Sequence, residues 1–196
     1  MVQVSTDFVF DGRQATPYRP DDVARPLNVY GKSKYNGEQL VQSVPDLAVA
    51  VVRTAWVYDA VSSNFVTTML RLMQERESLG VVADQIGSPT FAGGLANACW
   101  SLLGQTGKFH WTDAGVASWY DFAVAIQHSA LETGILDRRI PILPIPTKQY
   151  PTPAERPANS VLDKFSTWEV TEAEPLHWQF QLDAVLRASL VSISSK

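Results

Sequence analysis

An apolar, β-branched run opens the chain and ends at the turn pair Asp11 and Gly12. A second run, LAVAVVR at residues 47–53, is apolar at almost every position. Near-continuous apolar strands are typical of a parallel sheet that is covered on both faces. The pattern therefore predicts buried strands over residues 2–10 and 47–53, and the first of them needs a neighbour on each side.

The segment between these strands, residues 28–43, has the pattern of a helix. Its predicted inner face repeats at i, i+4, i+7 and i+11 and comprises Tyr30, Lys34, Gly37 and Val41. A strand, a helix and a strand in this order form a right-handed crossover by default. We therefore expect one βαβ unit at the start of the chain.

Helical patterns continue through the rest of the chain. Ser62 or Ser63 is predicted to cap a helix with one apolar stripe, and another helix is expected over about residues 92–103. Ser118 and Asp121 form a capping-box pattern that begins a third helix. A fourth helix is expected over roughly residues 177–189, with Trp178, Leu182, Val185 and Leu186 facing inward.

Short strands are expected at residues 81–84 and 108–111. Six of the twelve prolines lie in residues 141–157. Proline removes a backbone donor and breaks helices and central strands, so this segment is predicted to be an extended loop. Long ordered loops of this kind often form the wall or lid of a site.

Composition narrows the possible functions. The chain has 196 residues, of which 45% are hydrophobic and 18% charged, and its net charge of -4 provides no basic surface for nucleic acid. No apolar run approaches the roughly 18 residues that span a bilayer, and the first residues lack a signal-peptide pattern. The single cysteine, Cys99, lies among apolar residues and fits an inert thiol in a reducing compartment. We expect a cytoplasmic protein that contacts neither nucleic acid nor a membrane.

Candidate chemistry begins with Tyr30 and Lys34, whose spacing places both side chains on one face of a helix. A tyrosine with an ordinary pKa of about 10 is a poor acid near neutrality, but a fixed ammonium beside it makes it a usable one. The alternative is an exposed helix face with a solvated lysine. The three histidines show no metal-ligand spacing, so no metal site is predicted.

Three stretches in order, STDFVFDG, PLNVYGKSK and VVRTAWVY, give the chain a resemblance to the extended short-chain dehydrogenase/reductase family. NFVTTMLRL, ADQIGSPT, HWTDAGVASWYDFA and YPTPAERPANSVLD narrow the resemblance to the dTDP-4-dehydrorhamnose reductases within that family. It implies an α/β fold, with a partial Rossmann-type parallel sheet over residues 1–60 and a mostly helical substrate-binding lobe over residues 61–196. It also implies NADPH as cofactor and a dTDP-sugar as substrate, with reduction of dTDP-4-dehydro-L-rhamnose to dTDP-L-rhamnose.

By the same resemblance, Thr6 would hydrogen-bond the C4 carbonyl, Tyr30 would protonate the developing alkoxide, and Lys34 would bind the nicotinamide ribose. The other substrate-binding residues that it implies are Asp7, Trp56, Asn64, Phe65, Gln85 and Arg156. Three of these residues have a plainer interpretation: Asp7 as a strand-end turn former, Trp56 as a core residue, and Arg156 as a lone surface arginine.

The glycine-rich turn GxxGxxG that cradles the cofactor pyrophosphate in this family is absent from the sequence. The resemblance starts at what would be the fifth strand of the doubly wound sheet, which implies a chain without the first half of the cofactor-binding lobe. The strand at residues 2–10 would then offer an unpaired edge to a second copy or to a separate N-terminal half. Catalysis by this chain alone is expected to be impaired or absent, and the competing interpretation is a non-catalytic regulatory or assembly subunit.

Overall fold

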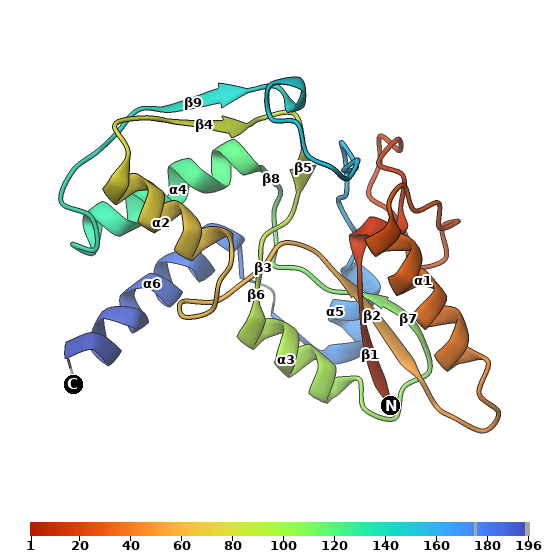
Figure 1. The fold of residues 1–196 in the computed structure, drawn as a ribbon. Helices are drawn as coiled ribbons and strands as arrows, with labels where there is room; N and C mark the ends of the chain where they lie inside the picture. Colours follow the sequence, from red (N-terminus) through yellow and green to blue (C-terminus); the bar gives the residue numbers. More distant parts are fainter. Residues whose placement is uncertain (175, 195–196) are drawn as a thin grey trace.

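A computed structural model describes residues 1–174 and 176–194, with side chains described through residue 188. The chain forms a small parallel sheet flanked by helices on one side of the molecule and a largely helical lobe on the other (Figure 1). The predicted α/β fold with parallel strands is therefore confirmed.

The sheet has three parallel strands in the order β1 (Val2–Thr6), β2 (Ala50–Thr54) and β7 (Gly107–His110). Among the strands that the structure describes, β1 pairs only with β2 and so lies at an edge. The first strand is shorter than predicted, because the Thr6 hydroxyl accepts a hydrogen bond from the Phe8 amide. This contact turns the chain into a 3-10 helix, η1 (Asp7–Val9), in place of further strand.

Helices cover both faces of this sheet (Figure 1). Ala50 and Val52 of β2 pack with Leu95 and Ala98 of α3 (Ala92–Ser101), and Trp168 of α5 (Phe165–Thr171) packs against the same cluster. On the other face α1 (Val29–Gln42) lies against β1, β2 and η1. Because β7, α3 and α5 follow residue 61, the later part of the chain contributes to this sheet as well as to the helical lobe.

The predicted inner face of α1 is wrong by about one residue. Gly31 and Glu38 are its buried residues, whereas Tyr30 is 54% exposed. The orientation follows from close packing, since a Cβ at Gly31 would lie 2.1 Å from the carbonyl oxygen of Phe8. Only glycine allows the helix to approach the end of β1 so closely.

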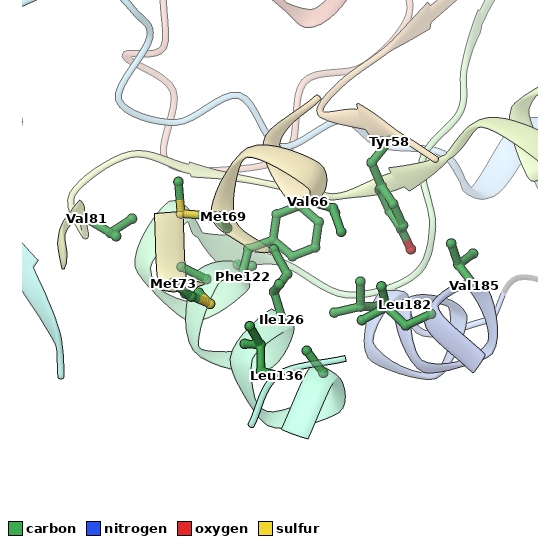
Figure 2. Close-up of a cluster of buried hydrophobic side chains, with 14 of the residues drawn as sticks. Tyr58, Val66, Met69, Met73, Val81, Phe122, Ile126, Leu136, Leu182 and Val185 are labelled. Atoms are coloured by element: carbon green, nitrogen blue, oxygen red, sulfur yellow. The ribbon is translucent and has the colours of Figure 1, made fainter. Parts of the chain in front are cut away.

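The helical lobe is built from α2 (Phe65–Glu75), α4 (Trp119–Glu132) and α6 (Trp178–Ser194). Figure 2 shows Phe122 and Ile126 of α4 between Met73 of α2 and Leu182 of α6. These four side chains are at most 1% exposed. The capping box that begins α4 at Ser118 is confirmed, as is the inward-facing stripe of the last helix.

Two local predictions for this lobe are wrong. The N-cap of α2 is Asn64 rather than Ser62 or Ser63, because its side chain accepts from the amide of Thr67. The proline-rich segment also contains a strand, β9 (Ile142–Ile145), and a 3-10 helix, η2 (Thr147–Gln149). β9 pairs with β4 (Leu79–Val82) in a two-stranded parallel sheet, an edge position that tolerates the missing amide of Pro144.

Short strand pairs join the sheet to the helical lobe. β3 (Val57–Tyr58) pairs with β6 (Thr90–Phe91), and β5 (Ile86–Gly87) pairs with β8 (Ala117–Ser118). The short β8 strand leads directly into α4, and Gln85 directly precedes β5. The join therefore brings the start of α4 close to the DQIGSPT segment. Within the described part of the chain, each helix is too short or too polar to cross a membrane.

Candidate functional site

The end of β1 carries two buried polar residues, Thr6 and Asp7, which are 5% and 3% exposed. The Thr6 hydroxyl donates to Asp7 Oδ1 at 3.0 Å. Among the described residues, Asp7 Oδ2 has no hydrogen-bond partner in the geometry of the structure. Burial raises the pKa of Asp7 to about 6, and the Ser160 and Thr6 hydroxyls beside the carboxyl offset part of that effect.

Tyr30 and Lys34 lie on the first two turns of α1, next to this strand end. Asn28 caps the helix by accepting from the Gly31 amide at 2.8 Å. The Tyr30 ring meets the Phe8 ring edge-on, with centroids 5.8 Å apart. Lys34 Nζ donates to the carbonyl oxygen of Val4 at 2.7 Å, on the edge strand. The structure thus places Thr6, Tyr30 and Lys34 on adjoining segments.

A narrow crevice of about 10 Å³ opens beside Phe8, next to the Thr6–Asp7 pair in the chain. Its lining comes from five separate segments and comprises Phe8, Trp56, Gln85, Ile86, Trp119, Arg156, Pro157 and Ser160. Asn28 holds the Arg156 loop in place, because its side-chain amide donates to the carbonyl of Glu155 at 2.8 Å. The same residue therefore caps the helix of Tyr30 and positions the loop of Arg156.

A larger, mainly apolar cavity of about 360 Å³ adjoins the crevice. The two spaces share Gln85, Trp119 and Arg156. Other lining residues come from α2, β4 and the proline-rich loop: Phe65, Thr68, Met69, Leu72, Leu79, Gly80, Val81, Val82, Tyr150 and Thr152. A cavity with apolar walls and a few converging polar groups is the usual form of a small-molecule site.

Stacked aromatic rings form the boundary between the two spaces. The indoles of Trp56 and Trp119 stack with centroids 3.5 Å apart, and Phe65 lies 4.6 Å from Trp119 on the cavity side. Trp119 Nε1 donates to Gln85 Oε1 at 3.2 Å, and Gln85 Nε2 donates to Thr147 Oγ1 at 3.0 Å. Gln85 is thereby fixed between α4 and the proline-rich loop.

The structure therefore brings together four of the predicted substrate-binding residues, Trp56, Phe65, Gln85 and Arg156, around these two adjoining spaces. Asn64 does not line it, because its side chain caps α2 and bonds to Asp59 and Ser62. Trp119 was missed as a site residue: its place after the Ser118 cap, on an apolar stripe, indicated core packing alone. Tyr150 and Thr152 were missed because only the fold brings the loop to α2.

Two other titratable residues, His110 and Cys99, do not line either space. The buried His110 ring contacts the Tyr18 and Asp163 carbonyls through Nδ1, and Cys99 is half-buried, which raises the pKa of its thiol. In residues 1–174 and 176–194, no three histidine, cysteine or acidic side chains gather in a way that could hold a metal ion.

A parallel sheet, a tyrosine and a lysine one turn apart on the helix beside it, and an adjoining lobe with a ligand-sized cavity define a Rossmann-like protein of the short-chain dehydrogenase/reductase type. More narrowly, the chain belongs to the RmlD substrate binding domain family, whose sequence model matches residues 1–191.

Curated and solved relatives agree with this assignment. The chain is 41% identical over 187 residues to the dTDP-4-dehydrorhamnose reductase of Aggregatibacter actinomycetemcomitans, covering 91% of this chain and 63% of that protein. It superposes on the dTDP-4-dehydrorhamnose reductase ortholog of Clostridium acetobutylicum with a TM-score of 0.86 and 37% identity, covering 96% of this chain and 65% of that one.

The Bacillus anthracis dTDP-4-dehydrorhamnose reductase, solved in complex with NADP, superposes with a TM-score of 0.84 and 34% identity, over 94% of this chain and 64% of that one. The chain thus spans just under two thirds of the length of these relatives.

Proposed function

We propose that this chain supplies the substrate-binding and proton-transfer parts of an NADPH-dependent reductase that converts dTDP-4-dehydro-L-rhamnose to dTDP-L-rhamnose. The observation that carries the proposal is the arrangement of Thr6, Tyr30 and Lys34 on segments that adjoin Phe8, which lines the crevice next to the ligand-sized cavity. Family membership and the names of the relatives supply the substrate class.

In this proposal the Thr6 hydroxyl turns its single hydrogen from Asp7 Oδ1 to the C4 carbonyl oxygen of the sugar. The Tyr30 phenol then gives its proton to the alkoxide oxygen that develops as the carbonyl is reduced. NADPH, when bound, supplies the hydride to C4. Tyr30 is exposed enough to reach a ligand, at 54% of its surface.

The residues present fit the nicotinamide end of that cofactor. Lys34 Nζ uses one of its three hydrogens on the Val4 carbonyl, which leaves two for the hydroxyls of a ribose. The residues present do not include a backbone cradle for the pyrophosphate, because the sequence has no glycine-rich turn of the GxxGxxG form. We infer that the pyrophosphate and adenine bind to protein outside these 196 residues.

The edge of β1 is the place where such protein would join. β1 pairs with β2 on one side, and its Val4 side chain is 40% exposed. An unpaired edge accepts a further strand by main-chain hydrogen bonds. We propose that a separate N-terminal half, or a second copy of the chain, pairs with this edge. Light scattering across a dilution series tests self-association, and a monomer at every concentration would exclude the second copy.

The substrate is proposed to lie across both spaces. The keto sugar would occupy the crevice once the Trp56 or Trp119 side chain moves aside, with Asp7 and Gln85 nearby. The deoxythymidine would fill the larger apolar cavity beside Phe65. Arg156 stands at the junction, where a guanidinium can bind diphosphate oxygens in two-pronged geometry. Asn64 would act indirectly, by fixing the start of α2 on which Phe65 sits. A cytoplasmic location, where nucleotide sugars and reduced cofactors are made, completes the proposal.

Calorimetric titration of the purified chain with NADPH, followed by NADPH oxidation with the dTDP-4-keto sugar, tests the function. Saturable binding and turnover that is lost in Tyr30→Phe and Lys34→Met support it. A chain that binds dTDP but gives no turnover, even with an added N-terminal half, contradicts the proposed catalysis and favours a regulatory role.

A further inference from the structure

A buried ion pair between Glu38 and Arg53 lies under the segments that carry the proposed proton-transfer residues. Arg53 Nε donates to Glu38 Oε1 at 3.0 Å and Nη2 donates to Oε2 at 2.7 Å, so the contact is two-pronged. The Arg53 side chain is 1% exposed and the Glu38 side chain is 0% exposed. The Ser5 hydroxyl also donates to Glu38 Oε1, and Arg53 Nη1 donates to the Pro20 carbonyl at 3.0 Å.

The positions of these partners along the chain give the pair its significance. Ser5 directly precedes Thr6, and Glu38 lies one turn beyond Lys34 on α1. Arg53 lies on β2, in register with Ser5 of β1. The network therefore connects the two segments that must be aligned for chemistry. α1 also packs closely on η1, where Gly31 lies against the Phe8 carbonyl. Tyr30 and Lys34 project from the part of the helix near these two contacts.

Stability alone does not account for a buried ion pair. Removing two charges from water is costly, and well-packed apolar side chains of similar volume often serve as well or better. A two-pronged ion pair adds geometric specificity to its stabilisation, because its hydrogen-bond directions restrict the rotation and the height of the helix.

We propose that Glu38 and Arg53 are positioning residues that set the distance between the Thr6 hydroxyl and the Tyr30–Lys34 pair. The expected effect on the reaction rate rests on the proposed reductase function. The expected effect on the distance between the Thr6 and Tyr30 hydroxyls does not. Misplacing a reacting group by about 1 Å can lower a rate about 100-fold. Other elements line the larger cavity in which the nucleotide is proposed to bind, so the affinity for the substrate should change little.

The principal variant is the double replacement Glu38→Leu with Arg53→Met, which removes both charges together and refills the space with apolar atoms. We expect kcat to fall at least tenfold while KM for the dTDP-sugar changes less than twofold. Arg53→Lys keeps the charge but cannot make the two-pronged contact, so it should show the same split to a smaller degree. Gln127→Leu is the matched control, since Gln127 is a buried hydrogen-bonding residue of α4 remote from this network.

A crystal structure of the double variant provides a readout that needs no turnover. The proposal expects a changed distance between the Thr6 and Tyr30 hydroxyls with the cavity walls unmoved. An unchanged distance, or equal losses in the double variant and the Gln127→Leu control, would overturn it. Absence of turnover in the unsubstituted chain would count against the proposed function alone, because the distance would still report on positioning.

Discussion

The indole rings of Trp56 and Trp119 stack almost parallel, with an interplanar angle of 9°, although 63 positions separate the two residues in the chain. Trp56 adopts a left-handed backbone conformation, with φ at 48°, which is unusual for a bulky residue. Such strain persists only where the surroundings over-determine it, and it is concentrated at functional sites. The stack forms one wall of the crevice and separates it from the larger cavity.

Gly87 makes room for this stack, and its replacement gives the first prediction. A Cβ at position 87 would lie 2.6 Å from Trp56 Cε2, so Gly87→Ala must push the indole away. We expect the near-ultraviolet circular dichroism signal of the coupled indoles to weaken and stability to fall by about 1–3 kcal/mol, as in other overpacked sites. Gly37→Ala is the control, because a Cβ there meets no atom within 4 Å. An unchanged dichroism spectrum in Gly87→Ala would contradict the close packing of Gly87 against the Trp56 indole.

The parts of the fold that were predictable are those that local pattern determines. The Ser118 capping box involves residues three positions apart, and the helix over residues 28–43 is visible in its own periodicity. The rotation of that helix was not predictable, because it depends on Gly31 meeting a backbone carbonyl and on Glu38 meeting Arg53. Neither contact leaves a trace in the hydrophobic pattern, which treats glutamate and arginine as surface residues.

The site residues also divide into those that a local pattern or motif predicts and those that only the fold brings together. Tyr30 and Lys34 form a short-range pair that a spacing argument finds, and family motifs added Gln85 and Arg156. Trp119 could not be found by pattern, because an aromatic residue on an apolar helix stripe is expected in a core. Its role at the cavity depends on Trp56 and Gln85, which the β5–β8 pairing brings next to the start of α4.

Asp7 should make the folded chain less stable as the pH rises, which is the reverse of the usual effect of a carboxyl group. Its pKa in the folded chain is raised to about 6 by burial, above the ordinary value of 3.8. Between these values the folded state binds the proton and the unfolded state does not, so the contribution of Asp7 to the free energy of unfolding decreases as pH rises. Asp7→Asn, which cannot ionise, should therefore gain stability over the unsubstituted chain by about 2 kcal/mol more at pH 7 than at pH 4.

Urea unfolding of both proteins at the two pH values measures this difference. Thr6→Val is a useful companion, because it removes the hydroxyl that donates to Asp7 without removing the carboxyl. It should keep the pH dependence that Asp7→Asn loses. Equal stability differences at pH 4 and pH 7 would show that the Asp7 carboxyl titrates alike in the folded and unfolded chain.

His110 should have the opposite effect and make the folded chain less stable as the pH falls. Burial, together with the nearby positive charge of Arg53, lowers its pKa to about 3 from the ordinary 6.5. Between those values the unfolded state binds the proton, so the contribution of His110 to stability is lost as pH falls from 6.5 toward 3. Between pH 7 and pH 5 this contribution should fall by about 2 kcal/mol.

His110→Asn keeps an amide donor near the position of Nδ1 for the Tyr18 and Asp163 carbonyls and removes the titration. Its free energy of unfolding should therefore decline less steeply over the same pH interval. Nitrogen NMR of the unsubstituted chain at pH 5 should find the His110 ring neutral with its proton on Nδ1, since carbonyl oxygens can only accept. A doubly protonated ring at that pH would refute the assignment.

Arg156 provides a direct test of the proposed diphosphate position. Its side chain borders both spaces, and a guanidinium bound to phosphate oxygens contributes about 1.5–3 kcal/mol, or roughly a tenfold to hundredfold change in affinity. Arg156→Ala should weaken dTDP binding by that factor in calorimetry yet leave thymidine binding unchanged, because thymidine lacks the diphosphate. Arg71→Ala is the matched control, as Arg71 is exposed and pairs with Glu75 on α2. If Arg156→Ala weakened dTDP and thymidine equally, the arginine would shape the cavity and would not bind the diphosphate.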